Sequence, residues 1–147
     1  MITLRFYEDA DQDAVLELWQ RAWEKTFSDI DFHERLETTF GQYWRAVIIP
    51  SAEIILAEEQ GTVAGVVTID PKTHYLDQLF VAPEYWGSTV AEVLLTEARR
   101  LSPSGVDLKV NARNHRAVRF YEKHGFVKIA SSDADSRVSV DTMQWRP

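Results

Sequence analysis

A segment able to bind phosphate begins at a strand-like apolar run, residues 75–81. Pro83 and Gly87 follow as turn residues, and the apolar residues of 90–101 then recur at helical spacing. A helix that starts directly after a tight turn presents free backbone N–H groups and the positive end of its dipole. We therefore expect residues 86–91 to hold an anionic group such as a pyrophosphate. The sequence contains neither of the common phosphate loops, GxGxxG and GxxxxGK(S/T).

A second segment, residues 108–126, places a tyrosine on a short helix. Asn114 is a favoured residue at a helix start and Gly125 just after a helix end, so the helix between them carries Ala117 and Tyr121. A tyrosine hydroxyl can donate a proton to a leaving group. Helical spacing alone favours a packing residue with a satisfied hydroxyl, so the acid role needs further support.

Composition excludes several kinds of chemistry. The 147 residues include no cysteine, which rules out disulfides, thiolate nucleophiles and cysteine-bound zinc, and no GxSxG elbow marks a serine nucleophile. The four histidines lack metal-site spacing such as HExxH, so we expect no metal, and His115 and His124 are expected to be solvated. The net charge of −7 and the scattered Lys and Arg residues argue against a nucleic-acid partner. The acidic excess either favours a cationic substrate or only keeps the protein soluble.

The N-terminal residues, MITLRFYEDADQD, alternate apolar and polar types and then turn acidic, unlike a secretion signal. No apolar run approaches the roughly 18 residues of a membrane span. We therefore expect a cytoplasmic protein that makes no contact with a membrane.

The order of elements predicts one mixed α/β domain, residues 1–147. The expected elements are a strand at 2–6, a helix beginning at 9–13, a helix at about 31–46, two hairpin strands around Gln60-Gly61, a strand at 74–81, a helix at 90–101, the strand VDLKV, a helix from Asn114 to Gly125, and strands at 126–129 and 138–145. Three consecutive strands without intervening helices exclude a doubly wound sheet.

Together the two segments resemble the signatures of the GNAT superfamily of N-acetyltransferases. These run roughly V-x-P-x-x-(Q/R)-G-x-G-x-(G/A) before a Leu-Leu helix, and N-x-x-A-x-x-(F/L)-Y-x-x-x-G-F. The matching positions are Val81, Pro83, Gly87, Ala91, Leu94 and Leu95 in the first, and Asn114, Ala117, Phe120, Tyr121, Gly125 and Phe126 in the second. The motifs cover about residues 74–130, and the order of strands extends the resemblance to the whole chain. Trp86 stands where Gln or Arg is usual, and Thr89 replaces a glycine.

The resemblance implies an α+β domain whose central sheet is mixed and mostly antiparallel, with about seven strands flanked by about four helices. It also implies acetyl-CoA as cosubstrate, lying along the strand that ends at Val81 and at the turn that opens the next helix. The residues assigned to this cofactor are Leu79, Phe80, Val81, Trp86, Gly87, Ser88, Thr89, Val90, Ala91, Asn114, Ala117 and Phe120. We expect Thr89 at or next to the helix start with an ordinary φ, a position where threonine is favoured.

In this family the amine attacks the thioester directly, which agrees with the missing nucleophiles. The resemblance assigns the general acid to Tyr121. Asp77 lies where some members carry a carboxylate that relays the proton of the amine, although an ordinary strand-surface carboxylate fits it equally well. Lys109 occupies another position where some members keep a catalytic Glu, and lysine is a poor base at neutral pH. The base therefore stays open between Asp77, water and another group.

The aromatic-rich first third corresponds to the wall of the acceptor site in this family. Most of its rings follow the apolar stripe and are expected in the core, and one or two could face the acceptor. Asp29, Asp31 and Glu34 could hold a cationic amine.

We favour an acetyl-CoA-dependent N-acetyltransferase that acts on a primary amine, whose identity the sequence does not give. One alternative is a noncatalytic acyl-CoA-binding or sensing domain, which the changed positions Trp86, Thr89 and Lys109 motivate. Another is a structural interaction protein on the same fold. The resemblance also implies a homodimer, since such domains often dimerise.

Overall fold

The computed structural model describes residues 1–28, 39–132 and 139–147. They form one seven-stranded sheet in the order β1-β2-β3-β4-β5-β7-β6, in which every neighbouring pair is antiparallel except β4 and β5. The strands are β1 (Ile2–Phe6), β2 (Glu53–Glu59), β3 (Thr62–Asp70), β4 (Tyr75–Val81), β5 (Val106–Asn111), β6 (Val127–Ser132) and β7 (Val140–Trp145).

The helices are α1 (Gln12–Thr26), α3 (Gly41–Tyr43), α4 (Ile49–Ser51), α5 (Val90–Leu101) and α6 (His115–Lys123). A π-helical turn, Trp44–Ile48, joins α3 to α4 in one continuous helical segment. Short 3-10 turns at Asp9–Asp11 and Pro83–Tyr85 precede α1 and the turn into α5.

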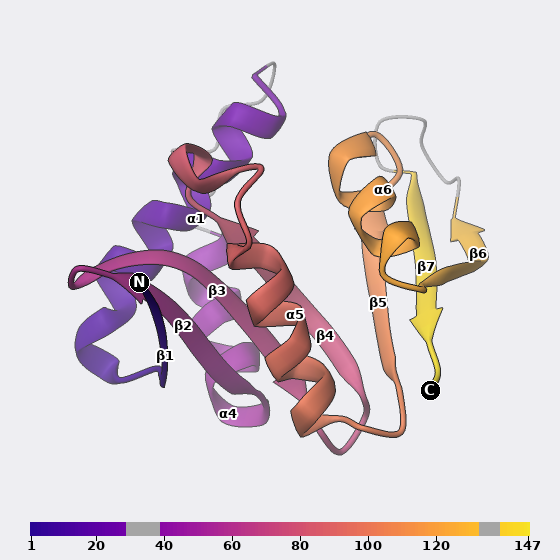
Figure 1. Ribbon diagram of the computed structural model, residues 1–147, viewed down its shortest axis with the longest axis horizontal. Coiled ribbons are helices and arrows are strands. Elements are labelled where there is room, and N and C mark those ends of the chain that lie inside the picture. Colours follow the sequence, from indigo (N-terminus) through magenta and orange to yellow (C-terminus); the bar gives the residue numbers. More distant parts are fainter. Residues whose placement is uncertain (29–38, 133–138) are drawn as a thin grey trace.

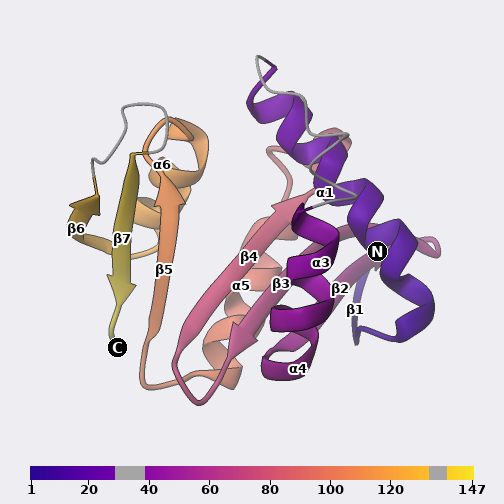
Figure 2. The ribbon, with the colours of Figure 1, turned by 180° about the vertical axis from the view of Figure 1, so that it is seen from behind.

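Helices cover both faces of the sheet. α5 lies on the face toward the viewer in Figure 1, and α1 with the α3–α4 segment lies on the opposite face, seen in Figure 2. Val66 and Val67 are neighbours in β3 and are both fully buried, but they belong to different cores because side chains alternate along a strand. Val67 belongs to the core that contains Leu94 of α5, and Val66 to the core that contains Trp19 of α1. The central strands therefore need apolar residues on both faces, which explains their continuous apolar runs.

Two glycines shape the sheet around β3. In the β2–β3 hairpin, Gln60 and Gly61 have φ values of 53° and 79°, as a two-residue hairpin turn with both central residues in the left-handed region requires. Within β3, a Cβ atom at Gly65 would lie 2.8 Å from Leu94 and 2.9 Å from Val90. Gly65 thus lets α5 approach the sheet closely.

β4 and β5 are paired at one end only. Tyr75 lies opposite Asp107 and Leu76 opposite Leu108, and the two strands then diverge (Figure 1). The later part of β4 therefore has no partner strand on its β5 side among the described strands. This opening places a free strand edge between the two halves of the sheet.

The expected α+β fold is confirmed, with two differences in element length. The second helix was expected to end near residue 46, but the π turn keeps the backbone helical into the final turn that contains Pro50. β6 was expected to end at Ile129, but it continues to Ser132 because polar residues there pair with β7. Residues 31–38 of the second helix and Val138 lie outside the described residues. No helix in the described ranges combines the length and the apolar character that crossing a membrane requires.

Candidate active site

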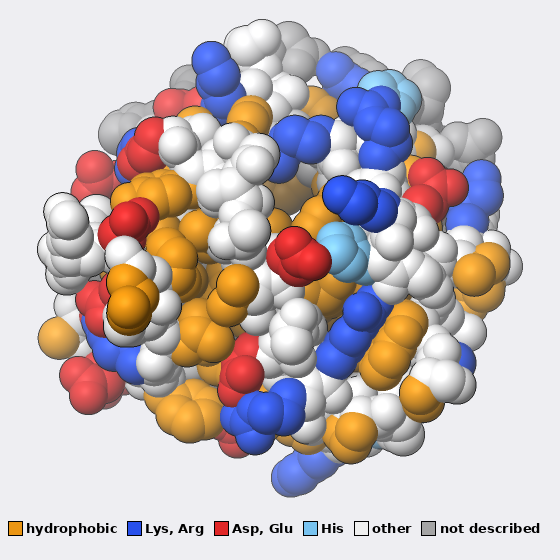
Figure 3. Space-filling view, viewed as in Figure 1, with side chains coloured by type: hydrophobic (Ala, Val, Ile, Leu, Met, Phe, Trp, Pro, Cys, Tyr) orange, Lys and Arg blue, Asp and Glu red, His pale blue; other side chains and the backbone are white. Residues whose placement is uncertain are grey.

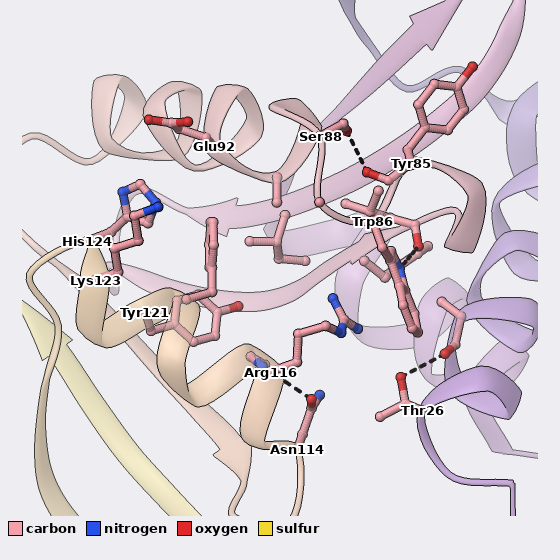
Figure 4. Close-up of a pocket in the computed structure, with 18 of the residues that line it drawn as sticks. Thr26, Tyr85, Trp86, Ser88, Glu92, Asn114, Arg116, Tyr121, Lys123 and His124 are labelled. Atoms are coloured by element: carbon pink, nitrogen blue, oxygen red, sulfur yellow. Dashed lines mark hydrogen bonds between the residues drawn. The ribbon is translucent and has the colours of Figure 1, made fainter.

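A cavity of about 360 Å³ opens beside the diverging strands β4 and β5. Side chains from α1, β4, α5, α6 and the turn before α5 line it, so it draws on both helical layers. In Figure 3, basic side chains lie along part of the rim of a hollow, with an acidic and a histidine side chain beside it. The ionisable side chains in the wall other than tyrosines are Glu92, Arg116, Lys123 and His124 (Figure 4).

The unpaired edge of β4 supplies backbone hydrogen-bonding groups to this cavity. Ala82 N–H donates to the Ala64 carbonyl of β3 at 2.8 Å. Because peptide groups alternate in direction along a strand, the N–H and C=O groups of Leu79 and Val81 point away from β3, toward the opening. An extended ligand that contains amides can pair with such an edge as another strand would.

The turn before α5 supplies a helix N-terminus. Gly87 has a φ of 82°, which glycine adopts without strain, and apart from Gly87 and its two chain neighbours no described atom lies within 4 Å of the position that a Cβ would take. Thr89 is the N-cap residue of α5, with φ −86° and ψ 1°, so its expected position is confirmed. Thr89 does not adopt a left-handed conformation, so threonine in place of the usual glycine causes no backbone strain here.

Trp86 lies across the cavity wall as a flat platform. Its indole Nε1 donates to the Val81 carbonyl at 2.9 Å, which fixes the ring against the end of β4. The guanidinium carbon of Arg116 lies 3.6 Å from the centre of that ring. A residue of the turn before α5 and a residue of α6 therefore meet in the cavity (Figure 4).

Local capping fixes α6, which carries the tyrosine. The Asn114 side chain accepts a hydrogen bond from Ala117 N–H at 3.2 Å, so Asn114 starts the helix as expected. Gly125 ends it with a φ of 90°, and Phe126 N–H donates to the Tyr121 carbonyl at 3.0 Å. Tyr121 therefore sits on a short helix that is closed at both ends.

The Tyr121 ring is buried, but its hydroxyl points into the cavity (Figure 4). Burial raises the pKa of Tyr121 well above its usual value, and the nearby positive charge of Arg116 opposes this increase. The hydroxyl thus keeps its proton at neutral pH and can donate it. Such a group suits a general acid and does not suit a base.

Asp77 lies on the other face of the sheet. Thr68 of β3 pairs with Gln78 and Ile69 pairs with Leu76, so Asp77 is the extra residue of a β-bulge. Its carboxylate accepts a hydrogen bond from the Tyr43 hydroxyl of α3 and another from Gln78 Nε2 at 2.9 Å.

Burial and this carboxylate raise the pKa of two tyrosines. The Tyr43 pKa increases because of burial first and the hydrogen bond to Asp77 second, and the Tyr75 pKa because of burial and the charge of Asp77. Asp77 is thus a carboxylate beside two protonated phenols on the α3 side of the β4–β5 opening.

The cavity gathers most of the residues that the sequence assigned to the cofactor and to catalysis. In its wall are Leu79, Phe80, Val81, Trp86, Gly87, Ser88, Ala91, Asn114, Ala117, Phe120 and Tyr121. Thr89 is exposed outside the wall, Val90 is buried in the core, and Asp77 lies on the α3 side. The acceptor candidates Asp29, Asp31 and Glu34 fall outside the described residues.

Sequence reasoning missed several residues of the cavity. His124 was expected to be solvated, but it is half-buried in the wall with its ring 4.6 Å from that of Phe120. The expectation was wrong because Arg99 of α5 donates to the His124 carbonyl and draws the end of α6 toward α5. The only sequence signal for Arg116 as a cavity residue was its place two residues after Asn114, which starts the helix. Trp23 could not be distinguished from the other aromatic residues on the apolar stripe of its helix.

Comparison with known proteins agrees with this geometry. The model of the Acetyltransferase (GNAT) family matches residues 12–126, most of the chain. The peptidyl-lysine N-acetyltransferase YjaB of Salmonella typhimurium (strain LT2) is 26% identical over 138 residues, which cover 92% of this chain and 90% of that protein. Its namesake from Escherichia coli (strain K12) is 25% identical over 138 residues, covering 92% of this chain and 88% of that protein.

Solved structures share the fold. The crystal structure of the PaiA N-acetyltransferase of Thermoplasma acidophilum in complex with coenzyme A has a TM-score of 0.80 and 20% identity, covering 100% of this chain and 99% of that chain. The solution structure of apo YjaB from Escherichia coli has a TM-score of 0.79 and 23% identity, covering 99% and 97%. From the family match, the two related acetyltransferases and the shared fold, the chain is a member of the GNAT family of acetyltransferases.

Proposed function

We propose that this enzyme transfers the acetyl group of acetyl-CoA to a primary amine by direct attack. The alkylammonium first loses one proton, and the nitrogen lone pair then forms a bond to the thioester carbon. The carbon–sulfur bond breaks, and CoA leaves as a thiolate that takes up a proton. The nitrogen releases its second proton as the amide forms.

One observation carries this proposal: the Tyr121 hydroxyl faces a cavity that the unpaired edge of β4 borders. The pantetheine arm of CoA is an extended chain with two amides, so it can pair with the N–H and C=O groups of Leu79 and the N–H group of Val81, while the Val81 carbonyl already accepts from Trp86. Its pyrophosphate then reaches the N-terminus of α5, where backbone N–H groups favour an anion. Its sulfur end enters the cavity toward Tyr121.

Tyr121 is the general acid in this proposal. A thiolate of this type has a pKa of about 8.5, so it gains from a proton donor as the carbon–sulfur bond breaks. The raised pKa of Tyr121 keeps the donor protonated, and the hydroxyl regains its proton from solvent after each turnover.

Asp77 is the base in this proposal. An alkylammonium has a pKa near 10.4 and is almost fully protonated at neutral pH, so attack requires a proton acceptor. The amine approaches from the α3 side of the β4–β5 opening, opposite Tyr121, and passes its proton to Asp77 directly or through water. The Tyr43 hydroxyl, which donates to Asp77, holds that carboxylate in place.

A lysine side chain is the first acceptor to test, because the two related proteins are named peptidyl-lysine N-acetyltransferases. The enzyme is incubated with acetyl-CoA and a panel of amines: a lysine peptide, the same peptide with its ε-amine blocked, a polyamine and free amino acids. Release of CoA thiol and the mass of the product are measured.

We expect thiol release that depends on a free amine and an acetylated product, with both greatly reduced in Tyr121→Phe. Saturable CoA binding without amine-dependent thiol release from any member of the panel would contradict the proposal and favour a sensing domain.

A further inference from the structure

We propose that Arg116, held over the ring of Trp86, binds a phosphate group of the cofactor. The inference rests on the proposed function, because it takes the cavity as the site of CoA. It assigns to α6 a charged contact that the sequence patterns did not contain.

Two contacts of Trp86 fix the position of the guanidinium: its hydrogen bond to Val81 and the placement of Arg116 over its ring. Trp86 precedes the turn into α5, and its indole N–H is bonded to the Val81 carbonyl at 2.9 Å. Arg116 reaches across from the first turn of α6 and stacks on that ring at 3.6 Å. A guanidinium placed over an aromatic face in this way keeps its N–H donors, which point outward in its own plane, available to another group.

The charge of Arg116 lacks the carboxylate partner found at four other arginines. Arg5, Arg21, Arg100 and Arg146 each form an ion pair with a carboxylate. Within residues 1–28, 39–132 and 139–147, no carboxylate forms an ion pair with Arg116. Glu92, which lines the same cavity, forms none with it either.

An uncompensated guanidinium in a cavity wall is a site for an anion. Burial lowers the pKa of Arg116, but arginine keeps its charge at any ordinary pH. Trp86, the residue under the guanidinium, is directly followed by Gly87 and the turn that opens the twelve-residue helix α5. The guanidinium therefore lies close to the turn that opens α5, and both the guanidinium and the N-terminus of that helix attract negative charge. Arginine also matches the geometry of phosphate oxygens with two parallel hydrogen bonds.

The test compares wild type with Arg116→Gln by calorimetric titration with CoA, dephospho-CoA and S-acetylpantetheine. Arg119→Gln is the matched control, because Arg119 lies on the same helix and outside the cavity wall. Loss of a charged hydrogen-bonding partner should weaken CoA binding about 10-fold to 100-fold. In Arg116→Gln the affinity for S-acetylpantetheine, which lacks phosphate, should stay unchanged. In Arg119→Gln the affinity for CoA should stay unchanged.

The ligands also identify the phosphate. If the variant loses affinity for CoA but not for dephospho-CoA, Arg116 binds the 3′-phosphate, and equal losses for both assign it to the pyrophosphate. Trp86→Leu should reduce CoA affinity about tenfold by releasing the guanidinium, and should cause little further loss when Arg116 is already Gln. Melting temperatures of all variants verify that they fold.

Two results would overturn the inference while leaving the proposed function intact. One is wild-type CoA affinity in Arg116→Gln, and the other is an equal loss for S-acetylpantetheine, which would place the guanidinium at the thioester end beside Tyr121. A wild-type protein that binds none of the three ligands would instead contradict the proposed function itself.

Discussion

Replacing Tyr121 with phenylalanine removes one oxygen atom from the cavity and leaves the ring in the core. The rings of Phe120 and Phe126 lie 5.4 Å and 5.3 Å from the Tyr121 ring, and a phenylalanine keeps both contacts. The described residues make no hydrogen bond to the hydroxyl, so the free energy of unfolding should change by less than about 1 kcal/mol. Turnover should fall about 10²-fold to 10⁴-fold, because a positioned proton donor contributes that much. This loss corresponds to about 2.7–5.4 kcal/mol of the activation free energy.

The assay measures thiol release at saturating acetyl-CoA and amine, together with CoA affinity and melting temperature. CoA affinity should remain close to that of wild type, because the hydroxyl acts only as the carbon–sulfur bond breaks. Tyr85→Phe is the matched control, since Tyr85 lines the same cavity without a proposed catalytic role. Full turnover in Tyr121→Phe, with normal folding and CoA binding, would refute the acid role and leave Tyr121 as a packing residue.

Three sets of substitutions and one change of pH test other parts of the site and of the core. Asp77→Asn should reduce the rate most at acidic pH, where the amine is most protonated, and less as pH rises; a pH–rate profile like that of wild type would exclude Asp77 as the base. Thr89→Gly should leave CoA affinity within about tenfold, because Thr89 has an ordinary φ. Gly87→Val should nearly abolish binding, because valine is strained at this left-handed φ and its side chain would block the approach of the cofactor to the backbone of the turn; calorimetry compares the two variants. Gly65→Ala should cost about 1–3 kcal/mol of unfolding free energy, because the added methyl overlaps Leu94 and Val90, and an unchanged urea midpoint would contradict that packing. The raised pKa of Tyr121 means that its contribution to stability is complete below about pH 10 and is lost as pH rises further, at up to about 1.4 kcal/mol per pH unit. Above about pH 10 the free energy of unfolding, measured by urea titration, should therefore fall less in Tyr121→Phe than in wild type. Equal losses would argue against a buried, protonated tyrosine.

Features set by local backbone chemistry could be predicted from the sequence. Gln60-Gly61 reads as a hairpin turn, and both residues have the positive φ that such a turn needs. Asn114 and Gly125 bound α6 as helix-capping residues do, and the apolar spacing of residues 90–101 matches α5. Each of these signals lies within a few residues of the element that it defines, so tertiary contacts were not required.

Features that depend on two distant segments could not be predicted. The bulge at Asp77 arises from the pairing of β3 with β4, and only this register turns the carboxylate toward Tyr43 of α3. The contact between Trp86 and Arg116 requires α6 to lie beside the turn before α5. His124 lines the cavity for a similar reason, since its position depends on how α6 docks on α5. The sequence contains these residue types but no local pattern that states their partners.

A crystal structure of the protein with CoA bound would show directly whether the cofactor places its sulfur beside Tyr121. We predict that the pantetheine amides pair with the N–H and C=O groups of Leu79 and with the N–H group of Val81, and that the pyrophosphate lies at the N-terminus of α5. The CoA sulfur should then lie within about 3.5 Å of the Tyr121 hydroxyl oxygen, the reach that proton donation requires. A sulfur atom held elsewhere, with Tyr121 facing only protein atoms, would contradict the proposed mechanism.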